Sequence, residues 1–151
     1  MNEQARILVI DDDKSIRDTL TAVLEEKGYA VETAENGEKA IEKSRTKFYN
    51  LALVDIRLPD MDGVQLLTTM KETVPKMVRI IITGYPSLQN AIEAVNKGAD
   101  GYVIKPFNID NVLNTIKEHL QKQREEKKYS EEKVREFVET RATELESRKA
   151  R

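Results

Sequence analysis

Short apolar runs alternate in this chain with longer stretches of helical periodicity, and no other feature limits the fold as strongly. Four runs have the length and composition of buried strands: 7–10, 51–54, 78–82 and 102–104. A weaker strand candidate, 29–33, alternates apolar and polar residues. Between these runs, apolar residues recur at helical spacing and predict helices with one apolar stripe, as in Ile16, Leu20, Val23 and Leu24, and in Leu88, Ala91, Ile92 and Val95.

Turn and capping residues agree with this alternation. Gly28 and Gly98 follow helical stretches where C-caps are expected, and Pro86 suits the first turn of a helix. Strands that alternate with helices of this length favour a parallel sheet covered on both faces, so we predict an α/β fold with five strands and five helices. The candidate N-caps are Asp13, Asn36 and Asn108.

The size and composition of the chain exclude several classes of protein. The 151 residues can form one domain with an appendage but not a second full domain. A net charge of -2 gives no general attraction to nucleic acid or to an anionic membrane. The absence of cysteine excludes disulfides and thiolate chemistry. The first apolar run is too short for a signal peptide or a membrane span, so we expect a cytoplasmic protein without a membrane partner.

The composition changes near residue 121, where a charged tail begins. Residues 117–151 contain eleven Lys or Arg and nine Asp or Glu, with no proline or glycine. We therefore divide the chain into a domain over 1–121 and a helical extension or linker over 122–151. Apolar heptad positions in the tail are sparse, and Ser130 can cap a new helix. One helix or two, a dimerising coiled coil or a linker to another domain all remain open.

Polar side chains directly follow several of the predicted strands. Because the carboxyl ends of parallel strands meet at one edge of a sheet, we expect these groups to lie together. Carboxylates gathered this closely repel one another unless a cation intervenes, and hard oxygen ligands suit Mg²⁺. An ammonium and a hydroxyl beside them suit phosphoryl oxygens, which leaves Asp55 as the candidate nucleophile. The residues are Asp11, Asp12, Asp55, Thr83 and Lys105.

These fragments, in this order and at this spacing, resemble the receiver domain of two-component response regulators. The resemblance covers about residues 5–121 and is carried by Asp11-Asp12, by 55–63 (DIRLPDMDG), by Thr83-Gly84 and by Lys105-Pro106-Phe107. It implies a flavodoxin-like, doubly wound sheet with strand order 2-1-3-4-5. It also implies Mg²⁺ as the cofactor and a histidine kinase as the phosphodonor.

The resemblance implies a role for each acidic residue of the site. Asp55 would accept the phosphoryl group. Asp12 and Asp55 would bind Mg²⁺ directly, together with the backbone carbonyl of Arg57, while Asp11 would hold a metal-bound water. Asp13 would be an N-cap and not a ligand.

The resemblance also implies the partners of the phosphoryl group. Lys105 would bridge to the Asp55 carboxylate or to its phosphate. The peptide bond between Lys105 and Pro106 would be cis. Thr83 would move toward the phosphoryl group and Tyr102 would follow it inward, although Tyr102 can also be read as ordinary core. Arg57 and Tyr85, each two residues after a site residue, would shield the phosphate and set its lifetime. His119, the only histidine, is expected on the exposed side of the last helix.

The resemblance implies a phosphorylation-driven switch of the surface formed by the fourth helix, fifth strand and fifth helix. We expect no enzyme activity beyond accepting and losing its own phosphate, and a homodimer through that surface and the tail is one expected output. An alternative is an input module joined through the tail to a larger sensor or effector. An aspartate-based phosphatase is disfavoured because Arg57 replaces the expected second aspartate. No nucleic-acid-binding fold is visible, so we expect no direct nucleic-acid partner.

Overall fold

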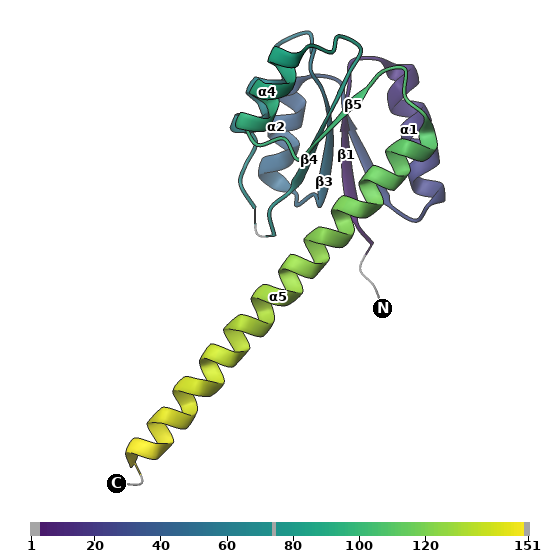
Figure 1. Cartoon of the computed structure of the whole chain (residues 1–151). Helices are drawn as coiled ribbons and strands as arrows, with labels where there is room; N and C mark the ends of the chain where they lie inside the picture. Colours follow the sequence, from purple (N-terminus) through teal and green to yellow (C-terminus); the bar gives the residue numbers. More distant parts are fainter. Residues whose placement is uncertain (1–3, 74, 150–151) are drawn as a thin grey trace.

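The computed structural model describes residues 4–73 and 75–149 and consists of alternating strands and helices (Figure 1). The strands are β1 (Arg6–Ile10), β2 (Ala30–Ala34), β3 (Leu51–Asp55), β4 (Val78–Thr83) and β5 (Gly101–Ile104). The helices are α1 (Lys14–Glu26), α2 (Gly37–Thr46), α3 (Gly63–Thr69), α4 (Leu88–Asn96) and α5 (Ile109–Lys149). The predicted number and order of elements are confirmed.

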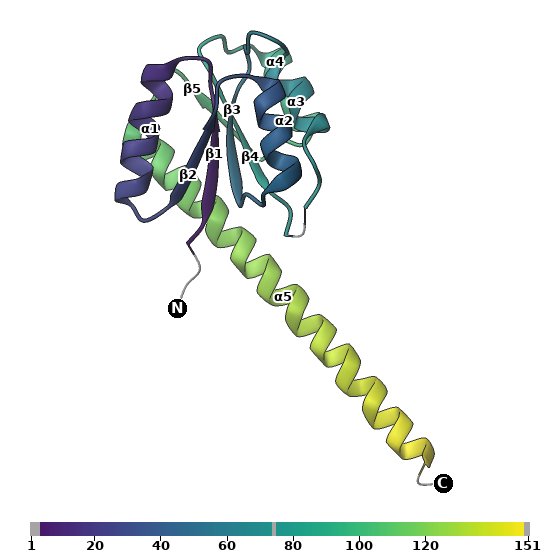
Figure 2. The ribbon, with the colours of Figure 1, turned by 180° about the vertical axis from the view of Figure 1, so that it is seen from behind.

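The five strands form one parallel sheet in the order β2-β1-β3-β4-β5. Helices cover both faces, as the two opposite views show (Figures 1 and 2). One core packs α2, α3 and α4 against the sheet through residues such as Ala40, Leu66 and Ala94. The other packs α1 and α5 through Leu24 and Ile116. The nearly continuous apolar composition of β1, β3 and β4 follows from this burial on two sides.

Capping residues explain where the helices begin and end. Asp13 accepts the backbone N–H groups of the first turn of α1, and Asn36 does the same for α2. Gly28 and Gly98 have positive φ angles just after α1 and α4, as predicted for C-caps. Pro86 does not lie in a first helical turn, because the N-cap of α4 is Ser87, whose hydroxyl accepts the N–H of Asn90.

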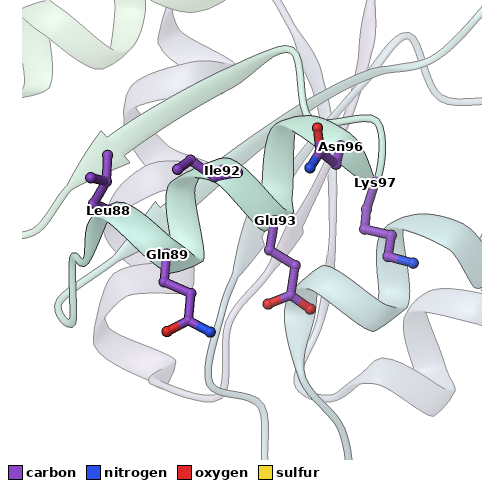
Figure 3. Close-up of a pocket in the computed structure, with 6 residues that line it drawn as sticks. All are labelled: Leu88, Gln89, Ile92, Glu93, Asn96 and Lys97. Carbon is purple, nitrogen blue, oxygen red and sulfur yellow. The ribbon is translucent and has the colours of Figure 1, made fainter.

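The apolar stripe of α4 faces outward, contrary to the usual interpretation of such periodicity. Leu88, Ile92 and Val95 are exposed, and only Ala94 of this helix is fully buried. Figure 3 shows Leu88 and Ile92 among the side chains that line a shallow pocket on this helix. The reason is that α4 enters the core through the small side chain of Ala94, which leaves its large side chains on the outer surface.

The last helix, α5, is a single helix and continues far beyond the sheet (Figures 1 and 2). Its first turns pack on the domain through Val112, Ile116 and Leu120, and Gln123 is the last buried residue. Every residue from 124 to 148 is exposed. Ser130 therefore does not begin a second helix. No helix in the part of the chain that the structure describes combines the length and apolarity needed to cross a membrane.

Candidate phosphoacceptor and metal site

The carboxyl ends of β1, β3, β4 and β5 bring the predicted site residues to one edge of the sheet. Parallel pairing aligns Asp55 with Ile82 and Thr83 with Ile104, so these strand ends are neighbours. Asp11 follows β1 directly and donates its backbone N–H to Ala34 at the end of β2. The acidic and polar groups therefore gather at this edge as a consequence of the strand order.

Three carboxylates form the acidic cluster of this edge. Oxygen atoms of Asp11, Asp12 and Asp55 lie within 4.8 Å of one another. Asp11 and Asp55 are only 3% and 7% exposed, whereas Asp12 faces solvent. Gly63 holds the start of α3 against β3, because any Cβ there would collide with the backbone oxygen of Asp55.

Lys105 places its ammonium between the two buried carboxylates. Its Nζ lies 2.8 Å from Oδ2 of Asp11 and 3.3 Å from Oδ2 of Asp55. Burial and the negative charge of Asp11 raise the pKa of Asp55, although Lys105 opposes this change. Burial alone would lower the pKa of Lys105, but the hydrogen bond and charge of Asp11 and the charge of Asp55 raise it overall.

The donor set fits a divalent cation. Three carboxylates and one ammonium give the cluster a net charge of -2. Two of the carboxylates are buried, where water screens their charge poorly. Carboxylate oxygens with one open, solvent-facing member suit Mg²⁺, which keeps several of its waters. Residues of this chain that could hold the ion are thus Asp11, Asp12 and Asp55.

Thr83 is fully buried at the end of β4. Its Oγ1 accepts the backbone N–H of Tyr85 at 3.0 Å, which leaves the hydroxyl proton free for another acceptor. Gly84 next to it approaches the side chain of Lys105, where an added Cβ would lie 3.8 Å from the lysine Cβ. The Lys105-Pro106 bond is cis, as predicted.

Tyr102 points into the protein from β5 and packs against the core that includes Ile81 and Ala94. Its hydroxyl is buried and has no hydrogen-bond partner among the residues that the structure describes. A buried hydroxyl without a partner is costly, so the ring is held here by packing and not by its polar end.

Two arrangements were not foreseen from the sequence. The guanidinium of Arg57 stacks on the ring of Tyr85, with Cζ 3.6 Å from the ring centroid, although the two side chains come from different loops. His119 is partly buried and not on an exposed face, because its ring nitrogens contact the backbone oxygens of Thr115 and Asp100 at 2.8 and 3.1 Å. Helix periodicity alone does not reveal that the loop before β5 covers this ring.

Comparisons with known proteins agree with this geometry. The family model for the response regulator receiver domain matches residues 7–117. A CheY-like response regulator receiver domain protein from Methanospirillum hungatei JF-1 has 44% sequence identity and a TM-score of 0.79, covering 82% of this chain and 99% of its own. A response regulator from Burkholderia pseudomallei, crystallised with a phosphorylated aspartic acid, a calcium ion and citrate, has 31% identity and a TM-score of 0.71, covering 82% and 72%.

Curated relatives include longer proteins. The transcriptional regulatory protein ZraR of Klebsiella oxytoca is 43% identical over 78% of this chain but only 27% of its own length. The chain thus spans about a quarter of the length of such relatives. Because these relatives are named as transcriptional regulators, the expectation of no direct nucleic-acid partner has no support from them.

Proposed function

The chain belongs to the response regulator receiver domain family, and on that premise we propose that Asp55 accepts a phosphoryl group from a histidine kinase. The observation that carries this proposal is the pair of buried carboxylates, Asp11 and Asp55, joined by the partly buried ammonium of Lys105. Phosphoryl transfer depends mainly on positioning and charge neutralisation, which this arrangement provides. The phosphorylated aspartic acid of the Burkholderia pseudomallei neighbour supports it by similarity.

We assign the remaining site residues accordingly. Mg²⁺ would neutralise the phosphoryl oxygens when bound, with Asp12, Asp55 and the backbone carbonyl of Arg57 as direct ligands and Asp11 as the holder of a water. Lys105 would pair with the phosphoryl group, and Thr83 would donate its free hydroxyl proton to it. Acceptance and slow loss of this phosphate are the only chemistry proposed, since no separate substrate site is required.

We propose that the output is a change of the surface formed by α4, β5 and α5. Thr83 ends β4 and pairs with Ile104 of β5, and Tyr102 lies two residues earlier in β5. A movement of Thr83 can therefore reach Tyr102 through β5. The exposed Leu88, Ile92 and Val95 supply an apolar surface on α4 that a partner can cover.

The tail is assigned as a helical extension after a receiver domain over 1–121. Gln123, which this division places in the extension, is buried and supports ending the domain about two residues later. The exposed Val134, Phe137, Val138 and Leu145 lie within three turns of α5 and give this helix a surface for a second copy or for a longer protein. The length of the curated relatives favours a receiver module joined through α5 to further domains. A cytoplasmic location without a membrane partner remains part of the proposal.

The acceptor is tested by labelling the full chain with acetyl phosphate in Mg²⁺ and by repeating the reaction in EDTA. Wild type and Asp18→Asn, which changes an exposed aspartate paired only with Lys14, should label equally, and Asp55→Asn should not label. Equal labelling of the Asp55 variant would reject the site.

Oligomeric state is tested by light scattering with and without beryllofluoride, and we expect Phe137→Ser to weaken any dimer. An unchanged monomer in all samples would reject the dimer.

A further inference from the structure

The loop from 56 to 62, which joins the acceptor strand β3 to α3, is tied closely at its two ends. Arg57 and Asp62 form an isolated antiparallel bridge, and the N–H of Gly63 donates to the backbone oxygen of Ile56 at 2.6 Å. The N–H of Arg57 also donates to Oδ1 of Asp55 at 3.3 Å. The tip of the loop, from 58 to 61, lies beyond these bonds and needs another anchor.

Asp60 provides that anchor by binding the N-terminus of α2. Its two carboxylate oxygens accept the backbone N–H groups of Gly37 and Glu38, each at 2.9 Å. These bonds lower the pKa of Asp60, so the carboxylate is charged where it meets the positive end of the helix. Met61 packs beside it so closely that a Cβ at Gly37 would collide with the methionine side chain.

The helix does not depend on Asp60 for its own N-cap. Asn36 already fills that position, and its side-chain oxygen accepts the N–H of Lys39 at 2.9 Å. The first-turn N–H groups of α2 are thus divided between a local side chain and one from 23 residues away in the sequence. Because Asn36 already caps the helix, the main effect of the two Asp60 bonds is to fix the position of the loop tip.

We propose that Asp60 is a positioning residue for the metal and phosphoryl site. The bridge to Asp62 and the bond to Asp55 hold Arg57 from the loop ends, and by fastening the tip to α2 Asp60 completes the immobilisation of the loop, so that the backbone carbonyl of Arg57 would keep its place for a divalent cation beside Asp55. Mg²⁺ demands near-ideal octahedral geometry, so a ligand on a loop must be held in place before the ion arrives. This inference rests on the proposed function, because that function assigns the Arg57 carbonyl to the cation.

The test compares Asp60→Ala with Asn36→Ala, a matched control that removes a cap from the same helix end without releasing the loop. Mg²⁺ is titrated into the 151-residue proteins and followed by the amide chemical shifts of residues 55–58 and 60–63, with no phosphodonor present. Loss of groups that orient metal ligands typically weakens metal binding 10- to 100-fold, and for this indirect tether we expect a Kd about three- to tenfold weaker in Asp60→Ala. Asn36→Ala should keep the wild-type Kd, and Asp60→Asn, which retains one acceptor oxygen, should fall between.

Two results would overturn the proposal: a wild-type Kd in Asp60→Ala, or the same weakening in both alanine variants, which would indicate a purely helix-capping role. Thermal unfolding of each variant checks that the comparison is made on folded protein, and Asp60→Asn serves if the alanine variant is unstable. Acetyl phosphate labelling of wild type is recorded separately. Absence of labelling with a clear Mg²⁺ shift pattern would reject the proposed function while still deciding the role of Asp60.

Discussion

The guanidinium carbon of Arg57 lies 3.6 Å from the centroid of the Tyr85 ring, so side chains that follow β3 and β4 stack directly on one another. Stacking on an aromatic face suits the planar, weakly hydrated guanidinium. Tyr85 is 56% exposed, and its backbone N–H is fixed by Thr83. We propose that this stacked pair covers the open side of the site and that each side chain holds the other in place.

Removal of this cover should shorten the life of the phosphoprotein. We expect Tyr85→Ala to lose phosphate roughly 3- to 10-fold faster, since a stacked cation–π pair is worth about 0.5–1 kcal/mol and its loss also admits water. Dephosphorylation is measured after removal of acetyl phosphate. Tyr129→Ala, which removes another exposed tyrosine beside a lysine, is the control and should decay at the wild-type rate. Equal rates for all three proteins would remove the shielding role.

The buried hydroxyl of Tyr102 should reduce stability in the unphosphorylated state. Because this oxygen has no hydrogen-bond partner among residues 4–73 and 75–149, Tyr102→Phe should raise the free energy of unfolding by about 1 kcal/mol. Tyr49→Phe is the opposite case, since the Tyr49 hydroxyl donates to Glu32 at 2.8 Å, and should lower stability. Urea unfolding measures both. Destabilisation by Tyr102→Phe would mean that the hydroxyl has a bonded role.

Glu32 should make the protein sensitive to acid. It accepts hydrogen bonds from three side chains: Arg6, Lys47 and Tyr49. Burial works to raise its pKa, but these bonds prevail and lower the pKa from 4.5 to about 2. A depressed folded-state pKa gives stability that is complete above pH 4.5 and is lost as the pH falls toward 2.

The corresponding experiment is urea unfolding of Glu32→Gln across this pH range. We expect a loss of about 1–2 kcal/mol at neutral pH, smaller than the full shift implies because partly exposed ion pairs are screened, and a shrinking difference from wild type below pH 4.5. Glu42→Gln, at an exposed position of α2, should track wild type at every pH. A pH-independent difference for the Glu32 variant would contradict the assignment.

Gln123 should be the residue that fastens α5 where the helix leaves the domain. Its amide donates to the backbone oxygens of Asn50 and Lys76 at 2.9 and 2.8 Å, and its oxygen accepts from the Asn50 side chain. Gln123→Ala removes the partner of the Lys76 carbonyl and of the Asn50 side-chain amide, while the Asn50 carbonyl keeps the N–H of Val78, and should cost about 1–3 kcal/mol in thermal or urea unfolding. The exposed neighbour Gln121→Ala should cost less than 0.5 kcal/mol. Equal stabilities of wild type and Gln123→Ala would show that the hydrogen bonds of Gln123 contribute nothing.

Features that depend on local chemistry were predictable from the sequence. Apolar runs gave the strands, and short-range capping gave the roles of Asp13, Asn36, Gly28 and Gly98, because each depends on bonds within a few residues. The gathering of Asp11, Asp55 and Lys105 followed from strand ends in a parallel sheet.

Features that depend on contacts between distant segments were not predictable. The Arg57–Tyr85 stack joins two loops, the Asp60 carboxylate crosses to α2, and the loop before β5 covers His119. The outward direction of the α4 stripe was not predictable, because periodicity indicates an apolar face but not the surface that it meets. Heptad reasoning likewise left α5 undecided between one helix and two, because the continuity of a charged helix depends on many weak local terms.

The proposed acceptor is tested most directly by locating the phosphoryl group chemically. The 151-residue protein, labelled with acetyl phosphate in Mg²⁺, is reduced with borohydride, which converts an aspartyl phosphate into homoserine, and the modified residue is identified by peptide mass spectrometry. We expect homoserine at Asp55 and at no other position. Modification at Asp11, Asp12 or Asp60 in place of Asp55, or a phosphoryl group on His119, would contradict it.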